Sequence, residues 1–326
     1  MSCLNLVLPG LIWQNNADYP YLQSHFIIPN FTKLLSKSKI SYAKLLVSDF
    51  LYAHDFNGEL SLAGSYAQKL GITGFQSYLL IEPTHLRVDR DRLLICESEL
   101  LQLNDEETMF AIGELNRHFI DDLQIFRLEN ELWLVGLKFK LHDDLISYPI
   151  CDIVGENIDD YLPTGTDRLR LHKLMNEMQM LLFNLPMNNQ REQDRLLALN
   201  SIWLWDISKA KLSFKFHDSP IFSNNPMFGK QYDKLEKVIA INDSYLLLDD
   251  VFYSACYRDS YTWINKLNQL DQGLMSEILF AFKNKKLTQL NVYVPNIIGG
   301  VRFSLSRYDL WKFWRRNIDW SQIIEN

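Results

Sequence analysis

The sequence predicts a mixed α/β protein, and three observations lead to this prediction. The chain has 326 residues, of which 47% are hydrophobic and 13% aromatic, so it can bury one large core or two smaller ones. Short apolar runs of strand length alternate with longer segments of helical periodicity. No Gly/Ser-rich or Pro-rich linker and no internal repeat interrupts that alternation.

Short apolar runs bounded by polar residues predict the strands. In the first third of the chain these runs cover residues 4–8, 43–47, 77–81 and 93–96. Two further runs, 124–128 and 132–139, flank Glu129-Asn130-Glu131 with the spacing of a hairpin. Later runs predict strands over residues 200–205, 290–294 and 301–306.

Three segments have the periodicity of helices. Asn104 is placed to cap the first, with Glu107 returning the hydrogen bond. The second covers residues 166–183, where leucines and methionines recur at steps of three and four. The third covers residues 261–283, and we expect a break near Gly273.

Charge and composition exclude several classes of protein. The formal net charge is −7 and the pI about 5.5, so the sequence has no overall basic field to hold nucleic acid. No run reaches the roughly 18 apolar residues of a membrane helix, and the N-terminal apolar run resembles a buried strand. The four cysteines contain no CxxC pair, which fits a reducing cytoplasm. We therefore expect a soluble cytoplasmic protein without nucleic-acid or membrane partners.

The chemical inventory predicts neither a metal site nor a cofactor. The seven histidines show no HxxxH or HExxH spacing. In the pairs at 54–55, 142–143 and 217–218, His adjoins Asp, but neighbours on a strand point to opposite faces. The sequence also lacks a GxSxG elbow, a Walker loop and a dinucleotide fingerprint. Cys151 precedes Asp152, and a buried structural thiol is favoured over a nucleophile because no positive group adjoins it.

One long stretch resembles a known family. Residues 149–205 contain PICDI, YLPTG, NLPMNNQR and NSIWLW in that order. These are similar to the P-H-D-I, Y-L-P-x-G, H-P-x-N-x-x-R and N-x-I-W-x-W-G segments of archaeal-type cofactor-independent phosphoglycerate mutases. NEMQMLL, EPTHLRVDRDRLLI, LNRHF and RYDLWKFWRR resemble the short bacterial relatives of these enzymes called RpfE-type regulatory proteins.

The resemblance implies a particular division of the chain. The mutases have an alkaline-phosphatase-like core interrupted by a substrate-binding subdomain. Transferred to this sequence, residues 1–75 and 200–326 form a degenerate core of that type. Residues 76–199 form an inserted α+β subdomain, similar to the one that binds substrate.

The chain departs from the family at the positions that bind the two metal ions. Pro9-Gly10 stands where the first strand of the mutases ends in Asp-Gly, and a proline side chain offers no oxygen to a metal. After the NSIWLW segment only His217 remains, so two imidazoles cannot come from that region. Ser65 lacks the flanking pattern of the family's nucleophile, and Cys151 replaces the histidine of P-H-D-I. The family reaction is therefore not expected.

The surviving positions suggest a site that holds an anion. Asp152, Asn188 and Arg191 match family positions that handle a phosphorylated acid, and Arg87 belongs to a second basic cluster. These four residues are the predicted ligand-binding set, with a small phosphorylated or carboxylate ligand. Alternatively, Arg191 is structural and pairs with Glu177, and the Arg87 cluster is a solvated, mutually neutralised face.

Two functions follow from these observations. The favoured prediction is a non-catalytic regulatory or ligand-sensing protein on a phosphoglycerate mutase scaffold, with no metal and an unidentified protein partner. The alternative is a metal-dependent phosphomutase or phosphatase whose ligands lie at unrecognised positions.

Overall fold

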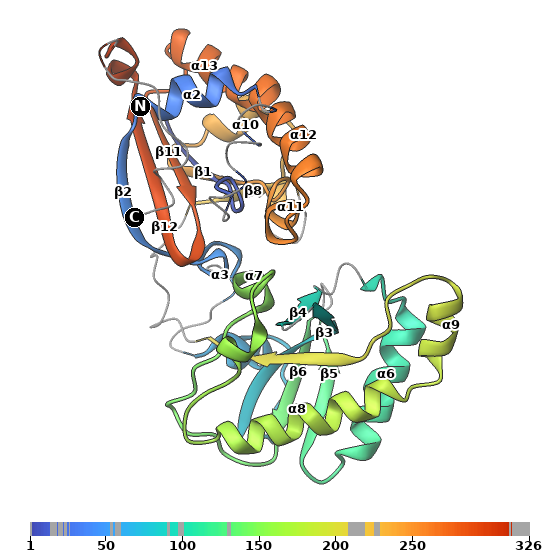
Figure 1. The fold of residues 1–326 in the computed structure, drawn as a ribbon. Helices are drawn as coiled ribbons and strands as arrows, with labels where there is room; N and C mark the ends of the chain where they lie inside the picture. Colours follow the sequence, from blue (N-terminus) through green and yellow to red (C-terminus); the bar gives the residue numbers. More distant parts are fainter. Residues whose placement is uncertain are drawn as a thin grey trace. The chain divides into compact units, whose positions relative to one another are not determined.

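The chain folds into two compact units of mixed α/β structure, which confirms the predicted class (Figure 1). The computed structural model describes residues 2–13, 18, 22, 25, 27–52, 55, 60–89, 92–96, 101–128, 132–207, 219–224, 229–312 and 314. Unit 1 consists of Met1–Leu51 and Ser213–Asn326, and unit 2 of Tyr52–Leu212. Within the described ranges, no helix is long and apolar enough to cross a membrane.

Unit 1 is built on a mainly parallel sheet. Its described strands are β1 (Cys3–Val7), β2 (Lys39–Leu45), β8 (Ile221–Ser223), β9 (Lys230–Gln231), β10 (Ser244–Leu247), β11 (Gln289–Val294) and β12 (Asn296–Ser306). They lie in the order β2-β12-β11-β1-β10-β8-β9. β1 is central and parallel to both β10 and β11, whereas β12 and β2 add an antiparallel edge. The predicted strands at 4–8, 290–294 and 301–306 are confirmed.

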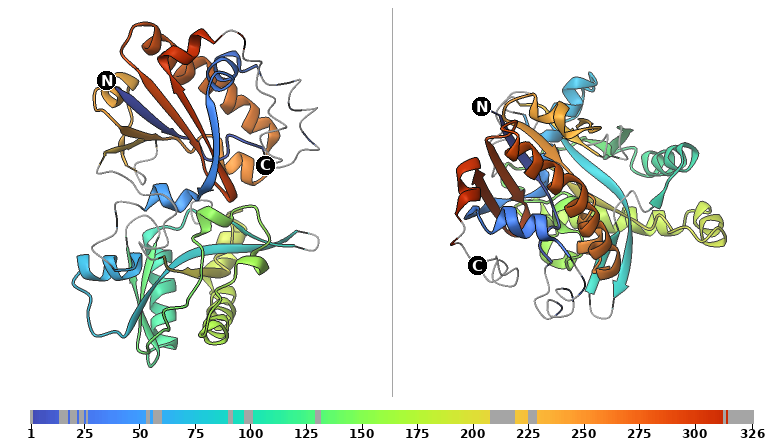
Figure 2. Two further views of the ribbon diagram at one scale, coloured as in Figure 1. Left: turned by 90° about the vertical axis from the view of Figure 1, so that its left-hand side faces the viewer. Right: turned by 90° about the horizontal axis from the view of Figure 1, so that it is seen from above.

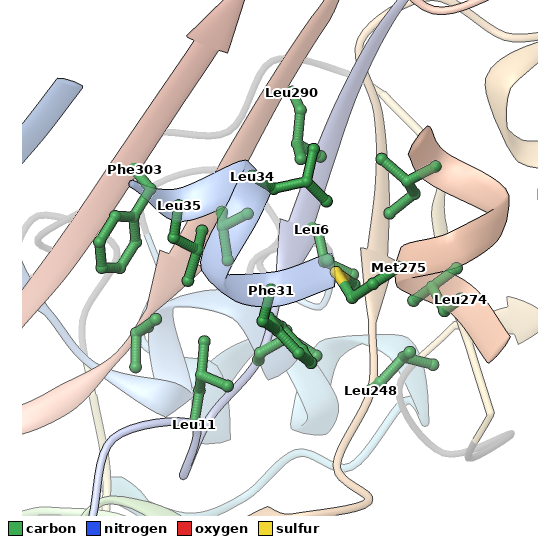
Figure 3. Packing of buried hydrophobic residues seen from close by; sticks show 14 of the residues in the cluster. Leu6, Leu11, Phe31, Leu34, Leu35, Leu248, Leu274, Met275, Leu290 and Phe303 are labelled. Carbon is green, nitrogen blue, oxygen red and sulfur yellow. The ribbon is translucent and has the colours of Figure 1, made fainter. Parts of the chain in front are cut away.

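Helices bury one face of this sheet. They are α2 (Pro29–Leu35), α10 (Leu235–Ile239), α11 (Phe252–Cys256), α12 (Ser260–Leu270) and α13 (Ser276–Lys283), with a 3-10 turn η5 (Arg307–Trp311) after the last strand. The short helix α3 (Val47–Leu51) packs its Phe50 against Val7 and Tyr293 on the other face. Leu6 of β1, Phe31 and Leu34 of α2, and Met275 lie in one fully apolar core (Figure 3). Side chains alternate along a strand, so Asn5 lies on the opposite face of the sheet.

The predicted irregularity near Gly273 is a π-helical turn. Asp271–Met275 (η4) joins α12 to α13, so the helix continues where a break was expected. Asp271 is fully buried there. Its carboxylate accepts hydrogen bonds from the backbone nitrogens of Phe31 (2.7 Å) and Asn30 (3.3 Å). The turn thereby places an anion at the N-terminus of α2, whose first N–H groups have no helical partner.

A polar network lies on the other face of the unit 1 sheet, beside the apolar cluster that contains Val7 and Tyr293. Asn291 donates to the Asn5 side chain at 2.9 Å and accepts from Arg302 and Ser304 at 3.1 and 3.0 Å. Cys3 lies at the edge of this network, 3.5 Å from the Asn291 amide. Burial, followed by a hydrogen bond to Asp243, raises the pKa of the Cys3 thiol to about 12.

The Cys3 thiol should make unit 1 sensitive to alkali. The folded state raises this pKa above its value in the unfolded chain. The stability that the protonated thiol contributes is therefore fully present below about pH 8.5 and is lost as the pH rises toward 12. We expect Cys3→Ser to become more stable relative to wild type by about 1–2 kcal/mol across that range, after allowance for solvent screening. Urea denaturation at several pH values measures this difference, and Cys256→Ser is the control. A parallel pH profile in both variants would contradict the assignment.

Unit 2 is organised around one long strand. β3 (Ser77–Asp89) pairs with β6 (Trp133–Leu137) over its first half and with β4 (Arg92–Cys96) over its second, and β7 (Ser201–Trp205) adds to its middle (Figure 2). β5 (Leu123–Arg127) pairs with β6, which confirms the hairpin; residues 129–131 lie outside the described ranges. Since β7 hydrogen-bonds to β3, residues 201–205 belong by contact to unit 2. The division predicted from the resemblance had grouped them with the core.

Helices complete the core of unit 2. They are α4 (Leu62–Lys69), α6 (Asp105–His118), α7 (Ile150–Ile153), α8 (Arg168–Phe183) and α9 (Met187–Gln193), with a 3-10 turn η2 (Ile158–Tyr161). The predicted capping box is present, because Asn104 and Glu107 exchange both hydrogen bonds. α8 and β7 share one hydrophobic cluster, and both tryptophans of β7 are buried. The prediction that this helix and strand pack in one core is confirmed.

Candidate functional site

Arg191 of α9 lies inside unit 2 and is bonded on all sides by protein. Its side chain is 1% exposed, and its Nη1 is 2.7 Å from a carboxylate oxygen of Glu107. Its Nε donates to the carbonyl of Leu197 at 2.8 Å, and its Nη2 donates to the carbonyl of Leu101. This geometry matches the structural alternative, with Glu107 in place of the expected Glu177, which lies 3.8 Å from Lys173.

Asn188 is engaged in the same way one turn earlier on α9. Its amide nitrogen donates to the carbonyls of Leu182 (2.9 Å) and Leu199 (3.0 Å), and its oxygen accepts from the Leu199 nitrogen (2.9 Å). Asn200 exchanges two similar bonds with the backbone of Leu86. These residues therefore secure the chain that leads into β7.

Asp152 lies on α7 in a different, acidic cluster. It is 7% exposed, and Glu82 of β3 accepts a hydrogen bond from the Ile150 nitrogen at the start of the same helix (3.1 Å). Burial and then the nearby Cys151, Glu82 and Asp152 raise the pKa of Tyr52 well above its usual value. Carboxylates beside a thiol are the opposite of the surroundings that activate a cysteine. The cluster can accept hydrogen bonds.

The fourth predicted residue, Arg87, lies on β3 where it pairs with β4, and its side chain is exposed. Arg90 of the same basic cluster lies outside the described residues. The four predicted residues are thus distributed over three elements. Arg191 and Asn188 share α9, Asp152 is on α7, and Arg87 is on β3.

The carboxyl end of β1 is the position at which the mutases carry their first metal-binding Asp. Here the chain turns at Pro9-Gly10, and Gly10 has a φ of +75°. A Cβ atom on Gly10 would lie 2.7 Å from the Phe252 Cα, so only glycine fits. The indole nitrogen of Trp263 donates to the Gly10 carbonyl at 2.8 Å, and its ring packs on Trp13 at 5.3 Å between centroids. Apolar side chains therefore pack against the turn that follows this strand.

Sequence reasoning overlooked a pair of carboxylates at the end of the neighbouring strand. Asp249 and Asp250 follow β10, and Asn224, after β8, donates to Asp250 at 2.8 Å. Burial and then the adjacent Asp249 raise the pKa of Asp250. An apolar strand ending in two aspartates was the pattern that indicated this site, since ligands of α/β sheets bind at the carboxyl ends of strands.

Metal-binding side chains are scattered over the described residues. Across the ranges given above, no three His, Cys, Asp or Glu side chains gather in a geometry that could hold an ion. His142 pairs with Asp167 at 3.0 Å and is 63% exposed. His54 and His217 lie outside the described residues.

Comparison with known proteins gives partial matches. No protein-family model matches the chain. A segment of 70 residues is 40% identical to a probable 2,3-bisphosphoglycerate-independent phosphoglycerate mutase of Geobacter sulfurreducens, covering 22% of this chain and 18% of that protein. A segment of 79 residues is 35% identical to the corresponding mutase of Methanothrix thermoacetophila, covering 24% of this chain and 20% of that protein. The matches thus span about a fifth of the length of each curated relative.

Two solved structures align over most of the chain at low similarity. The cofactor-independent phosphoglycerate mutase of Thermoplasma acidophilum gives a TM-score of 0.40 at 12% identity, covering 98% of this chain and 94% of that one. The PH0037 protein of Pyrococcus horikoshii gives 0.39 at 9% identity, covering 94% and 87%. By the sequence matches, a segment of this chain is related to the 2,3-bisphosphoglycerate-independent phosphoglycerate mutases.

Proposed function

We propose that this protein is a non-catalytic regulatory or ligand-sensing protein of the cytoplasm, of the RpfE type. In this proposal it has an alkaline-phosphatase-like scaffold related to the phosphoglycerate mutases, without their metal site. The observation that carries the proposal is the apolar packing against the turn that follows β1. Leu8 and Leu11 are fully buried there, and Trp263 bonds to the Gly10 carbonyl.

The physical reason lies in what a metal-dependent mutase requires at that point. Carboxylate ligands at the carboxyl end of a central parallel strand hold the ion that stabilises the transferring phosphoryl group. Pro9 supplies no ligand, and buried leucine and tryptophan side chains pack against the turn where the family's first ligand would lie. The surroundings of β1 therefore favour a scaffold role over family chemistry.

The proposed ligand is a small phosphorylated or carboxylate anion. Arg87 is the predicted residue with an exposed guanidinium, the group that binds such oxygens in a bidentate manner. Arg191 and Asn188 already bond to protein acceptors, and Asp152 is itself acidic. We therefore propose Arg87 as the contact to the anion.

A second function is favoured by one observation, the Asp249–Asp250 pair beside the end of β1. In this alternative the protein is a metal-dependent phosphomutase or phosphatase that uses these carboxylates. The pair would supply hard oxygen ligands of the kind that Mg²⁺ and Mn²⁺ prefer.

One set of measurements separates the two functions. Under the main proposal, the purified protein contains no stoichiometric Mn, Zn or Mg and does not interconvert phosphoglycerates when these ions are added. 3-Phosphoglycerate should raise the melting temperature of wild type but not of Arg87→Ala, with Arg117→Ala as an exposed-arginine control. About two ions per chain, with chelator-sensitive activity that Asp250→Asn abolishes, would establish the alternative.

A further inference from the structure

Arg302 of β12 is a half-buried arginine whose charge has no counter-ion in the described part of the chain. Its Nη2 donates to the Asn291 side chain at 3.1 Å, and its guanidinium carbon lies 5.2 Å from the centre of the Tyr293 ring. Its Nε is buried and meets no acceptor. Among the described residues, Arg302 forms no ion pair with a carboxylate. A cation that is partly removed from water and left unpaired favours the binding of an anion.

The ionisable groups around Arg302 do not supply that negative charge. The charge of Arg302 acts on Cys3, Tyr245 and Tyr293, and burial raises the pKa of all three, so each stays neutral at pH 7. Asp243 hydrogen-bonds to the Cys3 thiol and accepts from the Asn242 side chain at 2.8 Å. It makes no ion pair with Arg302. The guanidinium charge is therefore uncompensated within the described residues.

Two buried amides hold the guanidinium in position. Asn291 and Asn5 are 3% and 4% exposed. The Asn291 oxygen accepts from Arg302 and Ser304, and its nitrogen donates to the Asn5 oxygen at 2.9 Å. Asn5 donates in turn to the backbone carbonyl of Asp243 at 3.1 Å. Because the chain of bonds ends on backbone, Arg302 is oriented before a ligand arrives, which lowers the entropy cost of binding.

The edge strand β2 adds a second cation on the same face. Arg302 is paired with Ser41, and Ser304 with Lys39. Paired residues share a face, and diagonal neighbours such as Arg302 and Lys39 are within reach of long side chains. Lys39 and Ser41 are exposed, and Lys39 has no ion-pair partner in the described ranges. The Ser41 hydroxyl makes only a long bond, 3.5 Å, to the Arg302 carbonyl, so it is available as a further donor.

We propose that Arg302 and Lys39 bind a phosphate group on this face of unit 1. The Nη1 of Arg302, which has no protein partner in the described part of the chain, donates to one oxygen, and the Lys39 ammonium donates to a second. Two separate cations match the double charge and the spread of oxygens of phosphate better than those of a carboxylate. The inference does not rest on the proposed function, because Arg87 belongs to unit 2.

Titration of the ¹⁵N-labelled full chain with inorganic phosphate, at constant ionic strength, tests the proposal. The backbone amide signals of residues 39–41 and 302–304 should shift and saturate. Arg302→Gln keeps a donor for Asn291 but removes the charge, and Lys39→Gln removes the second cation. Each should weaken binding at least about tenfold. Circular dichroism should show the wild-type fold for both variants.

Lys44→Gln is the matched control. Lys44 is an exposed lysine of the same strand, but it lies five positions after Lys39 and therefore on the opposite face of the sheet. The control removes the same charge and should bind phosphate like wild type. Acetate, a monocarboxylate, should bind at least about tenfold more weakly than phosphate. A parallel titration with glycerol 3-phosphate shows whether free phosphate or a phosphomonoester is the tighter ligand.

Three results would overturn the proposal. They are signals that do not saturate with phosphate, binding that survives Arg302→Gln, and an equal loss of affinity in Lys44→Gln and Lys39→Gln, which would mean unspecific attraction by net charge. Arg87→Ala should bind phosphate at this face like wild type. The site on unit 1 therefore stands or falls separately from the proposed contact of Arg87 with 3-phosphoglycerate.

Discussion

Replacing Arg191 with alanine is expected to lower the free energy of unfolding by about 3 kcal/mol. The side chain is 1% exposed. Its removal takes the ion-pair partner from the Glu107 carboxylate and the guanidinium donors from the carbonyls of Leu197 and Leu101. Denaturant unfolding followed by circular dichroism measures the loss. Because the buried guanidinium of Arg191 bonds to protein acceptors, neither phosphate nor 3-phosphoglycerate should restore stability to the variant.

The matched control for Arg191 is an arginine in an exposed ion pair. Arg117 lies 2.6 Å from Glu114 and is 73% exposed, so Arg117→Ala should cost no more than about 0.5 kcal/mol. If Arg191→Ala unfolds like wild type, and an anion stabilises wild type but not the variant, Arg191 is a ligand residue and the structural assignment is incorrect.

Removing the Asp271 carboxylate should have a similarly large effect on unit 1. In Asp271→Ala, the backbone N–H groups of Asn30 and Phe31 lose a buried, charge-assisted acceptor, at a cost of about 3 kcal/mol. Asp271→Asn keeps one oxygen and should lose about half as much. Denaturant unfolding of both variants gives the values.

Asp259 provides the comparison for an ordinary helix cap. It accepts from the Thr262 nitrogen at 3.1 Å at the exposed start of α12, and Asp259→Ala should cost about 1 kcal/mol. Equal losses in Asp259→Ala and Asp271→Ala would mean that the buried carboxylate contributes no more than an exposed cap.

Local features of this fold could be predicted from the sequence because they depend on near neighbours. The apolar period gave α8, and the Asn104–Glu107 spacing gave the capping box, since both partners lie within one helical turn. The hairpin of β5 and β6 follows from two apolar runs around a short polar connection.

Long-range features could not be predicted, because their partners lie far apart in the sequence. Arg191 pairs with Glu107 across 84 positions, and no periodicity connects residues so far apart. The partner expected from the sequence, Glu177, lies only 14 positions before Arg191. β7 pairs with β3 across more than a hundred positions, which moved residues 201–205 into unit 2. The site at Asp249 and Asp250 escaped prediction because its partner Asn224 lies 26 positions earlier, beyond the reach of any local pattern.

One oxygen atom of Glu107 serves two parts of unit 2. It accepts from the Asn104 nitrogen (3.0 Å), which starts α6, and from Arg191 (2.7 Å), which anchors α9. If the first turn of α6 frays, Arg191 loses its counter-ion, and the Leu197 carbonyl that Arg191 holds is released with it. We therefore expect the start of α6, α9 and the chain before β7 to open as one cooperative segment, whose backbone amides exchange with solvent at a common rate.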